Sequence, residues 1–290
     1  IWVLLSVGVV PLLPGLRDKS EWTFRLKIFW TLYAAAHSVF VLWLFGNHLA
    51  FPFNLEVMES TVLQAVTRLH AGLAIYAPPS ADYVPLAYNP LFYFLAVPFT
   101  SLFGPTLAAI RIPATLGSIL SALLIYRILR SLAVTRWWAG IGVGIFAAAY
   151  RAMDCYLDVG HRDSLMLAAV LAGFHLLNRT DGASRIAGMC SLACAFWLKQ
   201  QGSGFLVAGA VFLLARHGVC GSFPAILAGV GLGPALYAFA PASWFGAEFH
   251  YYTWVLPRQW SEFTVEENLN LSILVVRTYG ALSLIAAAGM

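Results

Sequence analysis

The chain has 290 residues, of which 60% are hydrophobic and only 10% are charged, and its mean hydropathy is +0.77. Soluble domains carry about 25% charged residues, so this composition excludes an ordinary soluble protein and predicts an integral membrane protein. The net charge of +4 is small, and Lys and Arg lie in short clusters between apolar runs, so we expect no nucleic-acid partner.

Apolar stretches that predict membrane-spanning helices follow one another along the chain. Backbone polar groups within a bilayer must be satisfied internally, so we expect an all-α, polytopic transmembrane bundle forming a single domain over residues 1–290. Several stretches are shorter than the roughly 20 residues that cross the hydrocarbon core, so either their boundaries differ from those predicted or the helices continue into their polar flanks. The predicted spans are 28–49, 108–129, 137–150, 164–177, 186–198, 205–215, 223–240 and 271–290.

The two ends of the chain and its four cysteines carry separate expectations. The chain starts at Ile1 without a methionine and stops at Met290 within an apolar run, which predicts a fragment. Cys190 and Cys194 lie four positions apart on one apolar stretch without an accompanying His or carboxylate, and the other two cysteines are far away. This pattern favours apolar packing over metal ligation or a disulfide.

Residues 51–107 form the first polar interval, and 54–69 within it predict an amphipathic helix closed by Gly72. Glu59 lies at the edge of the apolar stripe of this helix, and Glu56 faces away from it. Desolvation can raise the pKa of a carboxylate between an apolar face and water, and such a carboxylate can act as a general base. The alternative is that both glutamates only solvate an interfacial helix. The stripe consists of Leu55, Met58, Val62, Val66 and Leu69.

The basic residues of the short loops predict the orientation of the bundle. If their three clusters share the cytoplasmic side, the number of crossings between clusters is even. The segment 90–104, which carries Pro98 and is shorter than a span, should then be re-entrant or lie on the surface, with a short true span as the alternative. The loops 51–107, 151–163 and 241–270 would face the non-cytoplasmic side of a plasma or inner membrane. The clusters are Arg17, Lys19, Arg25 and Lys27; Arg127, Arg130 and Arg136; and Arg179 with Arg185.

The loop 151–163 combines three aspartates, two arginines and a histidine in front of an apolar helix. Asp163 stands where an N-cap belongs, and Arg162 can be an interface anchor. The cluster exceeds what capping requires, however, and guanidinium groups are favoured partners of phosphate oxygens. Lys199, which ends the fifth predicted span on the same side, either extends outward to water or contacts a phosphate.

A set of motifs follows in order between residues 50 and 205: Glu59, Gly72, Tyr76, Tyr88-Asn-Pro-Leu-Phe-Tyr93, Phe103-Gly104, Arg111-Ile-Pro, Arg162-Asp163-Ser-Leu and Lys199-Gln-Gln-Gly. This ordered set resembles the membrane glycosyltransferases of the GT-C fold, which include protein O-mannosyltransferases and aminoarabinose lipid A transferases. Two details depart from the O-mannosyltransferase pattern. Glu56 and Glu59 are three apart instead of adjacent, and a Pro-Pro-Leu segment appears as Asn89-Pro90-Leu91.

This resemblance implies a polyprenyl-phosphate sugar as the donor, with Glu59 and Asp163 as the acids of the first and second outer loops. We expect inverting transfer in which Glu59 takes a proton from an acceptor hydroxyl, while Lys199 and Arg162 stabilise the departing lipid phosphate. Further substrate contacts are expected from His161, Tyr88, Tyr76 and Asp158. A divalent metal is compatible with this chemistry, but no ligand pattern supports one. The acceptor, a lipid, glycan or protein, stays open.

Two other function classes fit the same composition. A transporter or flippase-like binder of lipid-linked sugars would use a cationic outer groove without chemistry, and would place polar groups near the bilayer midplane. A structural membrane subunit would have no acidic and basic cluster in one cavity. A transferase instead requires Glu59, Asp163 and Lys199 around one pocket on the outer side.

Overall fold

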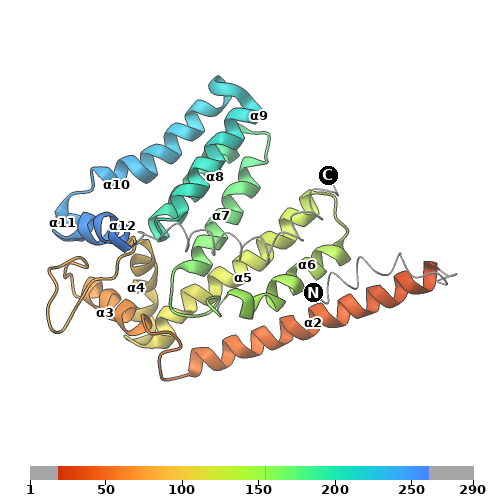
Figure 1. Ribbon diagram of the computed structural model, residues 1–290, viewed down its shortest axis with the longest axis horizontal. Helices are drawn as coiled ribbons and strands as arrows, with labels where there is room; N and C mark the ends of the chain where they lie inside the picture. Colours follow the sequence, from red (N-terminus) through yellow and green to blue (C-terminus); the bar gives the residue numbers. More distant parts are fainter. Residues whose placement is uncertain (1–18, 154, 261–290) are drawn as a thin grey trace. The chain divides into compact units, whose positions relative to one another are not determined.

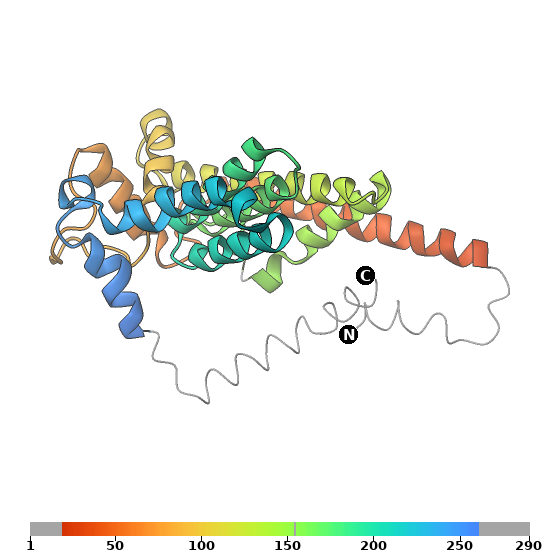
Figure 2. The ribbon, with the colours of Figure 1, turned by 90° about the horizontal axis from the view of Figure 1, so that it is seen from above.

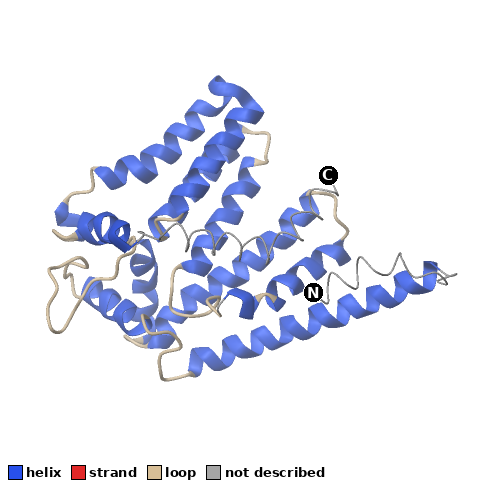
Figure 3. Cartoon of the chain, viewed as in Figure 1, coloured by secondary structure: helices blue, strands red, loops and turns tan. Residues whose placement is uncertain are grey.

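The protein is described from a computed structural model covering residues 19–153 and 155–260, which consist of helices, loops and turns without a strand (Figure 3). Residues 30–255 form one compact unit, and the described residues 19–29 and 256–260 belong to a second. The predicted span 271–290 and the last part of the predicted loop 241–270 lie outside the described residues.

The described residues form helices and single helical turns that are joined by loops. In chain order they are α2 (Lys19–Ala50), α3 (Glu59–His70), α4 (Leu91–Phe103), α5 (Leu107–Ser131), α6 (Arg136–Ala148), the 3₁₀ turn η2 (Tyr150–Met153), α7 (Asp163–Leu177), α8 (Gly182–Leu198), α9 (Gly202–Val230), the π-helical turn η3 (Gly231–Ala235), α10 (Leu236–Ala238), α11 (Ala242–Phe245), the π-helical turn η4 (Tyr251–Val255) and α12 (Leu256–Trp260).

Three stretches of helix are long and apolar enough to cross a membrane: Phe24–Ala50, Leu107–Ser131 and Gly202–Ala238. The helices α4, α7 and α8 are apolar too, but they have only 13, 15 and 17 residues. The segment 90–104 does form a helix, with Pro98 inside it, and its re-entrant course stays a prediction. The described part of the chain is therefore that of an all-helical membrane protein.

The third long stretch is broken at Gly218, whose φ of +66° and ψ of −177° suit only glycine. A Cβ atom on Gly229 would lie 3.2 Å from the Leu206 side chain, and one on Gly233 would lie 3.3 Å from it. The half of α9 after the break therefore folds back along the half before it. This matches the two separate helices predicted at 205–215 and 223–240.

The predicted helix over 54–69 begins at Glu59 instead, so that expectation was wrong for its first turn. In the segment before α3, backbone N–H groups donate to side-chain carboxylates and not to the backbone carbonyls that an α-helix would use. The Leu55 N–H donates to Glu59 at 2.7 Å, and the Met58 N–H donates to Glu56 at 2.8 Å. These bonds hold 54–58 in a turn, and they leave Glu59 fully buried on the inner face of α3, not at its edge.

Helix α5 connects the two ends of the compact unit. It packs against α6 and α7 along its length, while α3 and α4 lie beside the end where α5 begins (Figures 1 and 2). Small residues allow close approach: a Cβ on Gly117 would lie 2.8 Å from the Leu165 backbone nitrogen, and one on Gly188 would lie 2.9 Å from the Gly173 carbonyl oxygen. The start of α7 is thereby fixed against α5, and α8 is fixed against α7.

Candidate active site

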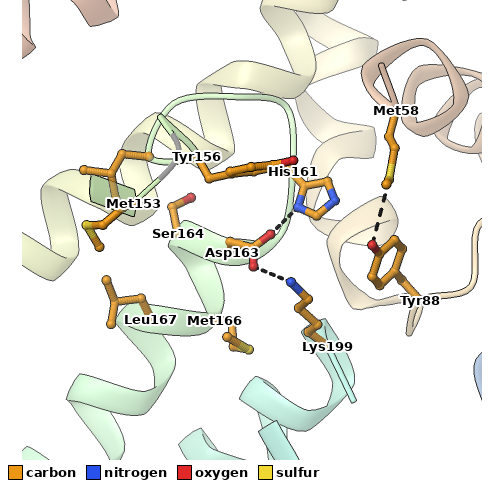
Figure 4. A pocket seen from close by; sticks show the side chains of 11 residues that line it. Met58, Tyr88, Met153, Tyr156, His161, Asp163, Ser164, Met166, Leu167 and Lys199 are labelled. Atoms are coloured by element: carbon orange, nitrogen blue, oxygen red, sulfur yellow. Dashed lines mark hydrogen bonds and ion pairs between the residues drawn. The ribbon is translucent and has the colours of Figure 1, made fainter. Parts of the chain in front are cut away.

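A cavity of about 440 Å³ lies at the start of α7 (Figure 4). It brings together the end of α8, the loop before α7, the turn before α3 and the segment before α4. Its wall combines methionine and leucine side chains with one carboxylate, one histidine and one lysine. The lining residues are Met58, Tyr88, Met153, Tyr156, Leu157, His161, Asp163, Ser164, Met166, Leu167 and Lys199.

The Asp163 carboxylate is the centre of the polar wall. Its Oδ1 accepts a hydrogen bond from the Lys199 ammonium at 2.6 Å, and its Oδ2 contacts the Nδ1 of His161 (Figure 4). Burial alone would raise the pKa of Asp163, but His161 and Lys199 together hold that pKa well below its usual range. Asp163 is therefore an ionised carboxylate at neutral pH.

The local backbone explains how Asp163 and Lys199 meet. Asp163 is the first residue of α7 and makes no capping bond, so the predicted N-cap role does not apply. The Ser164 hydroxyl next to it donates to the Ala114 carbonyl of α5 at 2.7 Å, which fixes this end of α7. Lys199 follows the last residue of α8 in an extended conformation, and its side chain is only 18% exposed. The lysine therefore points inward to the carboxylate and not outward to water.

His161 is 3% exposed and stands between two aromatic rings, those of Tyr88 and Tyr156. Burial, helped by the nearby charges of Arg162 and Lys199, lowers the pKa of His161 to about 4. The imidazole is thus neutral at pH 7, with its Nδ1 hydrogen directed to Asp163. Its Nε2 has no hydrogen-bond partner among the described residues. His161 consequently orients one oxygen of Asp163.

Arg162 is fully buried, and none of its three guanidinium nitrogens finds a hydrogen-bond partner within 19–153 and 155–260. Its Cζ atom lies 3.6 Å from the centre of the Tyr88 ring and 5.9 Å from that of Tyr93. Arg162 does not line the cavity, whereas Tyr88 does. The guanidinium therefore adds positive potential through an aromatic ring instead of contacting a ligand directly.

Glu59 lies outside this cavity and is also fully buried. Its Oε1 accepts from the Arg111 Nε at 2.8 Å and from the Gly160 N–H at 2.7 Å. Its Oε2 accepts from the Arg111 Nη2 at 2.6 Å and from the Leu55 N–H at 2.7 Å. Burial would raise the pKa of Glu59, but these four donors hold it below its ordinary value. The contacts with Gly160 tie Glu59 to the loop that carries His161 and Asp163.

Arg111 was not among the predicted site residues, although it organises this side of the site. Besides Glu59, its guanidinium donates to three carbonyls at the end of α2 and just after it, those of His48 and Phe51 at 2.7 Å and that of Phe53 at 2.6 Å. An arginine inside an apolar predicted span needs a carboxylate or carbonyl partner, so the position of Arg111 in the sequence already indicated a buried polar contact. The sequence did not indicate which carboxylate would supply it.

Asp158 and Tyr76 are buried away from the cavity as well. Asp158 accepts from the Tyr150 hydroxyl at 2.7 Å and contacts the Nδ1 of His48 at 2.6 Å. Tyr76 donates its hydroxyl hydrogen to the carbonyl of Tyr88. Of the eight predicted site residues, the cavity thus brings together His161, Asp163, Lys199 and Tyr88, while Glu59, Arg162, Tyr76 and Asp158 lie behind its wall.

An apolar groove of about 400 Å³ adjoins the cavity between α2, α5 and α6, and Leu157 lines both. Its other lining residues are nearly all apolar, including Val41, Phe45, Ile119 and Phe146. Such a surface accepts a hydrocarbon chain. No group of three or more His, Cys, Asp or Glu side chains converges to hold a metal within the described residues.

A sequence model of one glycosyltransferase family matches residues 86–289, which is well over half of the chain. The chain belongs to glycosyltransferase family 87. The protein is therefore a glycosyltransferase of the membrane, and the transporter and structural-subunit alternatives are set aside. The match includes Tyr88, His161, Asp163 and Lys199, whereas Glu59 lies outside it. Comparison with curated proteins and with solved structures gave no match.

Proposed function

We propose that this glycosyltransferase moves a sugar from a polyprenyl-phosphate donor to an acceptor hydroxyl at the non-cytoplasmic face of the membrane, in a multi-pass bundle of the GT-C type. The observation that carries the proposal is the Asp163–Lys199 pair within one cavity, because it joins a proton acceptor to a phosphate-binding cation at 2.6 Å. The adjoining groove at Leu157 supports a donor with a long apolar chain.

The reaction needs one bond to form and one to break. The acceptor oxygen attacks the anomeric carbon, and the bond from that carbon to the phosphate oxygen breaks. The phosphate leaves with the electron pair, and the acceptor proton passes to Asp163. A phosphate leaves readily once its charge is countered, so the protein mainly supplies position, one base and one cation.

We assign the base to Asp163 and not to Glu59, because all acceptor positions of Glu59 are occupied and its buried side chain does not line the active-site cavity. In the absence of donor, His161 and Lys199 together hold the pKa of Asp163 low and make it a weak base. A donor phosphate would compete for the Lys199 ammonium. As Lys199 turns to the phosphate, Asp163 loses a cation, its pKa rises, and Oδ1 becomes free for the acceptor hydroxyl.

The surrounding residues keep this pair in place. His161 holds the second oxygen of Asp163, and Arg162 behind Tyr88 adds positive potential for the phosphate. Glu59 holds the loop before α7 through Gly160. Each of these three residues acts through another residue and not on the substrate directly, so we treat them as positioning residues.

The test uses the full-length protein in lipid with a polyprenyl-phosphate sugar, and follows release of the free lipid phosphate. Asp163→Asn should lower single-turnover rates about 10²–10⁴-fold while donor binding stays within a few-fold. Lys199→Ala should weaken donor binding as well as turnover, because its cation faces the phosphate in the ground state. Asp82→Asn, at an exposed loop carboxylate, is the matched control and should change neither.

Two outcomes contradict the proposal in different ways. Unchanged turnover in Asp163→Asn would show that the cavity is not the reaction site. Turnover with a nucleotide sugar but with no lipid-linked sugar would retain the site and overturn the donor class.

A further inference from the structure

A second polar cavity, of about 510 Å³, lies where α5 and α7 end and α9 approaches its break at Gly218. Four arginines and a histidine line it, and none of its lining residues is acidic. The basic residues are Arg127, Arg130, Arg179, Arg216 and His175. Four guanidinium groups around one hollow repel each other, so the cavity favours an anion.

Within the part of the chain that the structure describes, only some of the guanidinium nitrogens of these arginines have a hydrogen-bond acceptor. One nitrogen of Arg130 donates to the Val134 carbonyl at 2.6 Å, and one of Arg216 donates to the Asn178 side chain at 3.0 Å. For Arg127 and Arg179, the described residues provide no hydrogen-bond acceptor. The neighbouring carboxylate of Asp181 does not line the cavity and accepts from the Ser184 N–H at 2.7 Å instead. Donor groups are therefore available for a ligand.

The wall of the cavity indicates what sort of anion it suits. Guanidinium groups bind phosphate oxygens in pairs, which favours a phosphate-type ligand. Tyr126 lines this cavity and also the apolar groove between α2, α5 and α6, so a hydrocarbon surface begins beside the arginines. Basic pockets between helices at a membrane surface are typical sites for anionic lipid headgroups.

We propose that this cavity binds the phosphate headgroup of an anionic membrane lipid, separately from the sugar donor. The active-site cavity lies at the start of α7 and this one at its end, and the 15 residues between correspond to about 22 Å of helix. By the distribution of Lys and Arg in the loops, this end faces the cytoplasm. The lipid holds the ends of α5, α7 and α9 together at the surface opposite the reaction.

Two explanations of the basic cavity that require no bound lipid must be distinguished from this proposal. Arginines at the C-terminal ends of helices are favoured by the helix dipole without any ligand. The second explanation is that the cavity binds free phosphate as readily as a lipid phosphate. If the helix dipole alone explains the arginines, lipid binding to the cavity should not depend on the type of lipid. If free phosphate binds equally well, the cavity should not prefer a phosphate that carries acyl chains.

The experiment measures bound lipid on the full-length protein by native mass spectrometry after reconstitution in phosphatidylcholine with a minor fraction of phosphatidylglycerol. The double variant Arg127→Gln/Arg179→Gln should lose phosphatidylglycerol occupancy roughly tenfold or more, since each arginine near an anionic surface contributes several-fold in affinity. Arg136→Gln, an exposed arginine at the start of α6 outside the cavity, is the matched control and should retain it.

A second variant and a second ligand make the result decisive. Arg127→Lys/Arg179→Lys keeps the charge and should keep most of the phosphatidylglycerol, which answers the objection that the double variant misfolds. Inorganic phosphate at the concentration of the lipid should not displace it. Unchanged phosphatidylglycerol occupancy in Arg127→Gln/Arg179→Gln, equal loss in Arg136→Gln, or full displacement by inorganic phosphate would each overturn the proposal.

Discussion

At the scale of single residues, the buried ion pair between Glu59 and Arg111 is the contact on which the loop before α7 depends. Both side chains are 0% exposed, so removing one charge leaves the other unpaired in a place that water does not reach. Breaking such a pair costs about 3–5 kcal/mol. We expect Glu59→Gln to lower the free energy of unfolding by that amount, as measured by denaturant unfolding in detergent.

Glu56→Gln is the control, because within residues 19–153 and 155–260 the Glu56 side chain accepts only from the Met58 N–H, so the change should alter stability little. Measuring turnover per folded molecule distinguishes an effect of Glu59→Gln on stability from an effect on catalysis. With Asp163 as the base, folded Glu59→Gln should keep its turnover within a few-fold. A loss of a hundredfold or more in the folded variant would return the base to Glu59.

The buried histidine of the active site predicts a dependence of stability on pH. The pKa of His161 falls from 6.5 to about 4 on folding, so between these values the unfolded chain binds a proton that the folded chain does not. The free energy of unfolding should therefore decrease as pH falls from about 6.5 to about 4, by at most about 1.4 kcal/mol per pH unit from this group.

Thermal unfolding between pH 7 and pH 4.5 measures this slope. His161→Asn, whose amide can replace the Nδ1–H donor to Asp163 without titrating, should flatten it. The carboxyl of Asp163 affects stability in a separate, more acidic pH range. Because folding lowers its pKa, the stabilisation that its ionised form provides is lost only below pH 4. An identical slope in His161→Asn would show that folding does not lower the pKa of His161.

At the scale of elements, the sequence allowed the helices to be predicted but not the contacts that join them. Apolar runs bounded by basic clusters indicated the helical stretches, and the side assignment placed Asp163 and Lys199 at the same outer end of successive helices. The pairing of Glu59 with Arg111 was not predictable, because it depends on how α3 packs across α5. The start of α3 was misplaced for a related reason: side-chain acceptors close the turn before Glu59, and periodicity does not detect them.

The break in α9 yields a prediction of its own. Gly218 adopts a backbone conformation that is nearly exclusive to glycine, and a side chain there is strained whatever space surrounds it. We expect Gly218→Ala to lower the free energy of unfolding by about 1–3 kcal/mol. Gly204→Ala is the matched control within α9, because it has open space and ordinary helical geometry and should be neutral or slightly stabilising. Equal stability of the two variants in thermal unfolding would contradict the strain.

At the scale of the whole molecule, the sidedness of the membrane decides where the reaction occurs. Ser80 and Ala152 are exposed in the two loops expected on the non-cytoplasmic side, whereas Thr180 is exposed in the turn expected on the cytoplasmic side. Single cysteines at these positions, in a chain whose four native cysteines are replaced, should react differently with an impermeant thiol reagent added outside. We expect labelling at residues 80 and 152 only. Labelling of just one of them would place the two loops on opposite faces.

The shortness of α7 has a consequence for the bilayer around it. If α7 crosses the membrane, its 15 residues supply about 22 Å against a hydrocarbon thickness of about 30 Å. A hydrophobic mismatch of this size is relieved when lipids beside the helix compress toward the protein. The headgroup plane would then dip next to Asp163 and Lys199. A lipid-linked sugar would reach them by lateral diffusion within the thinned leaflet, and its phosphate would not have to be drawn through hydrocarbon.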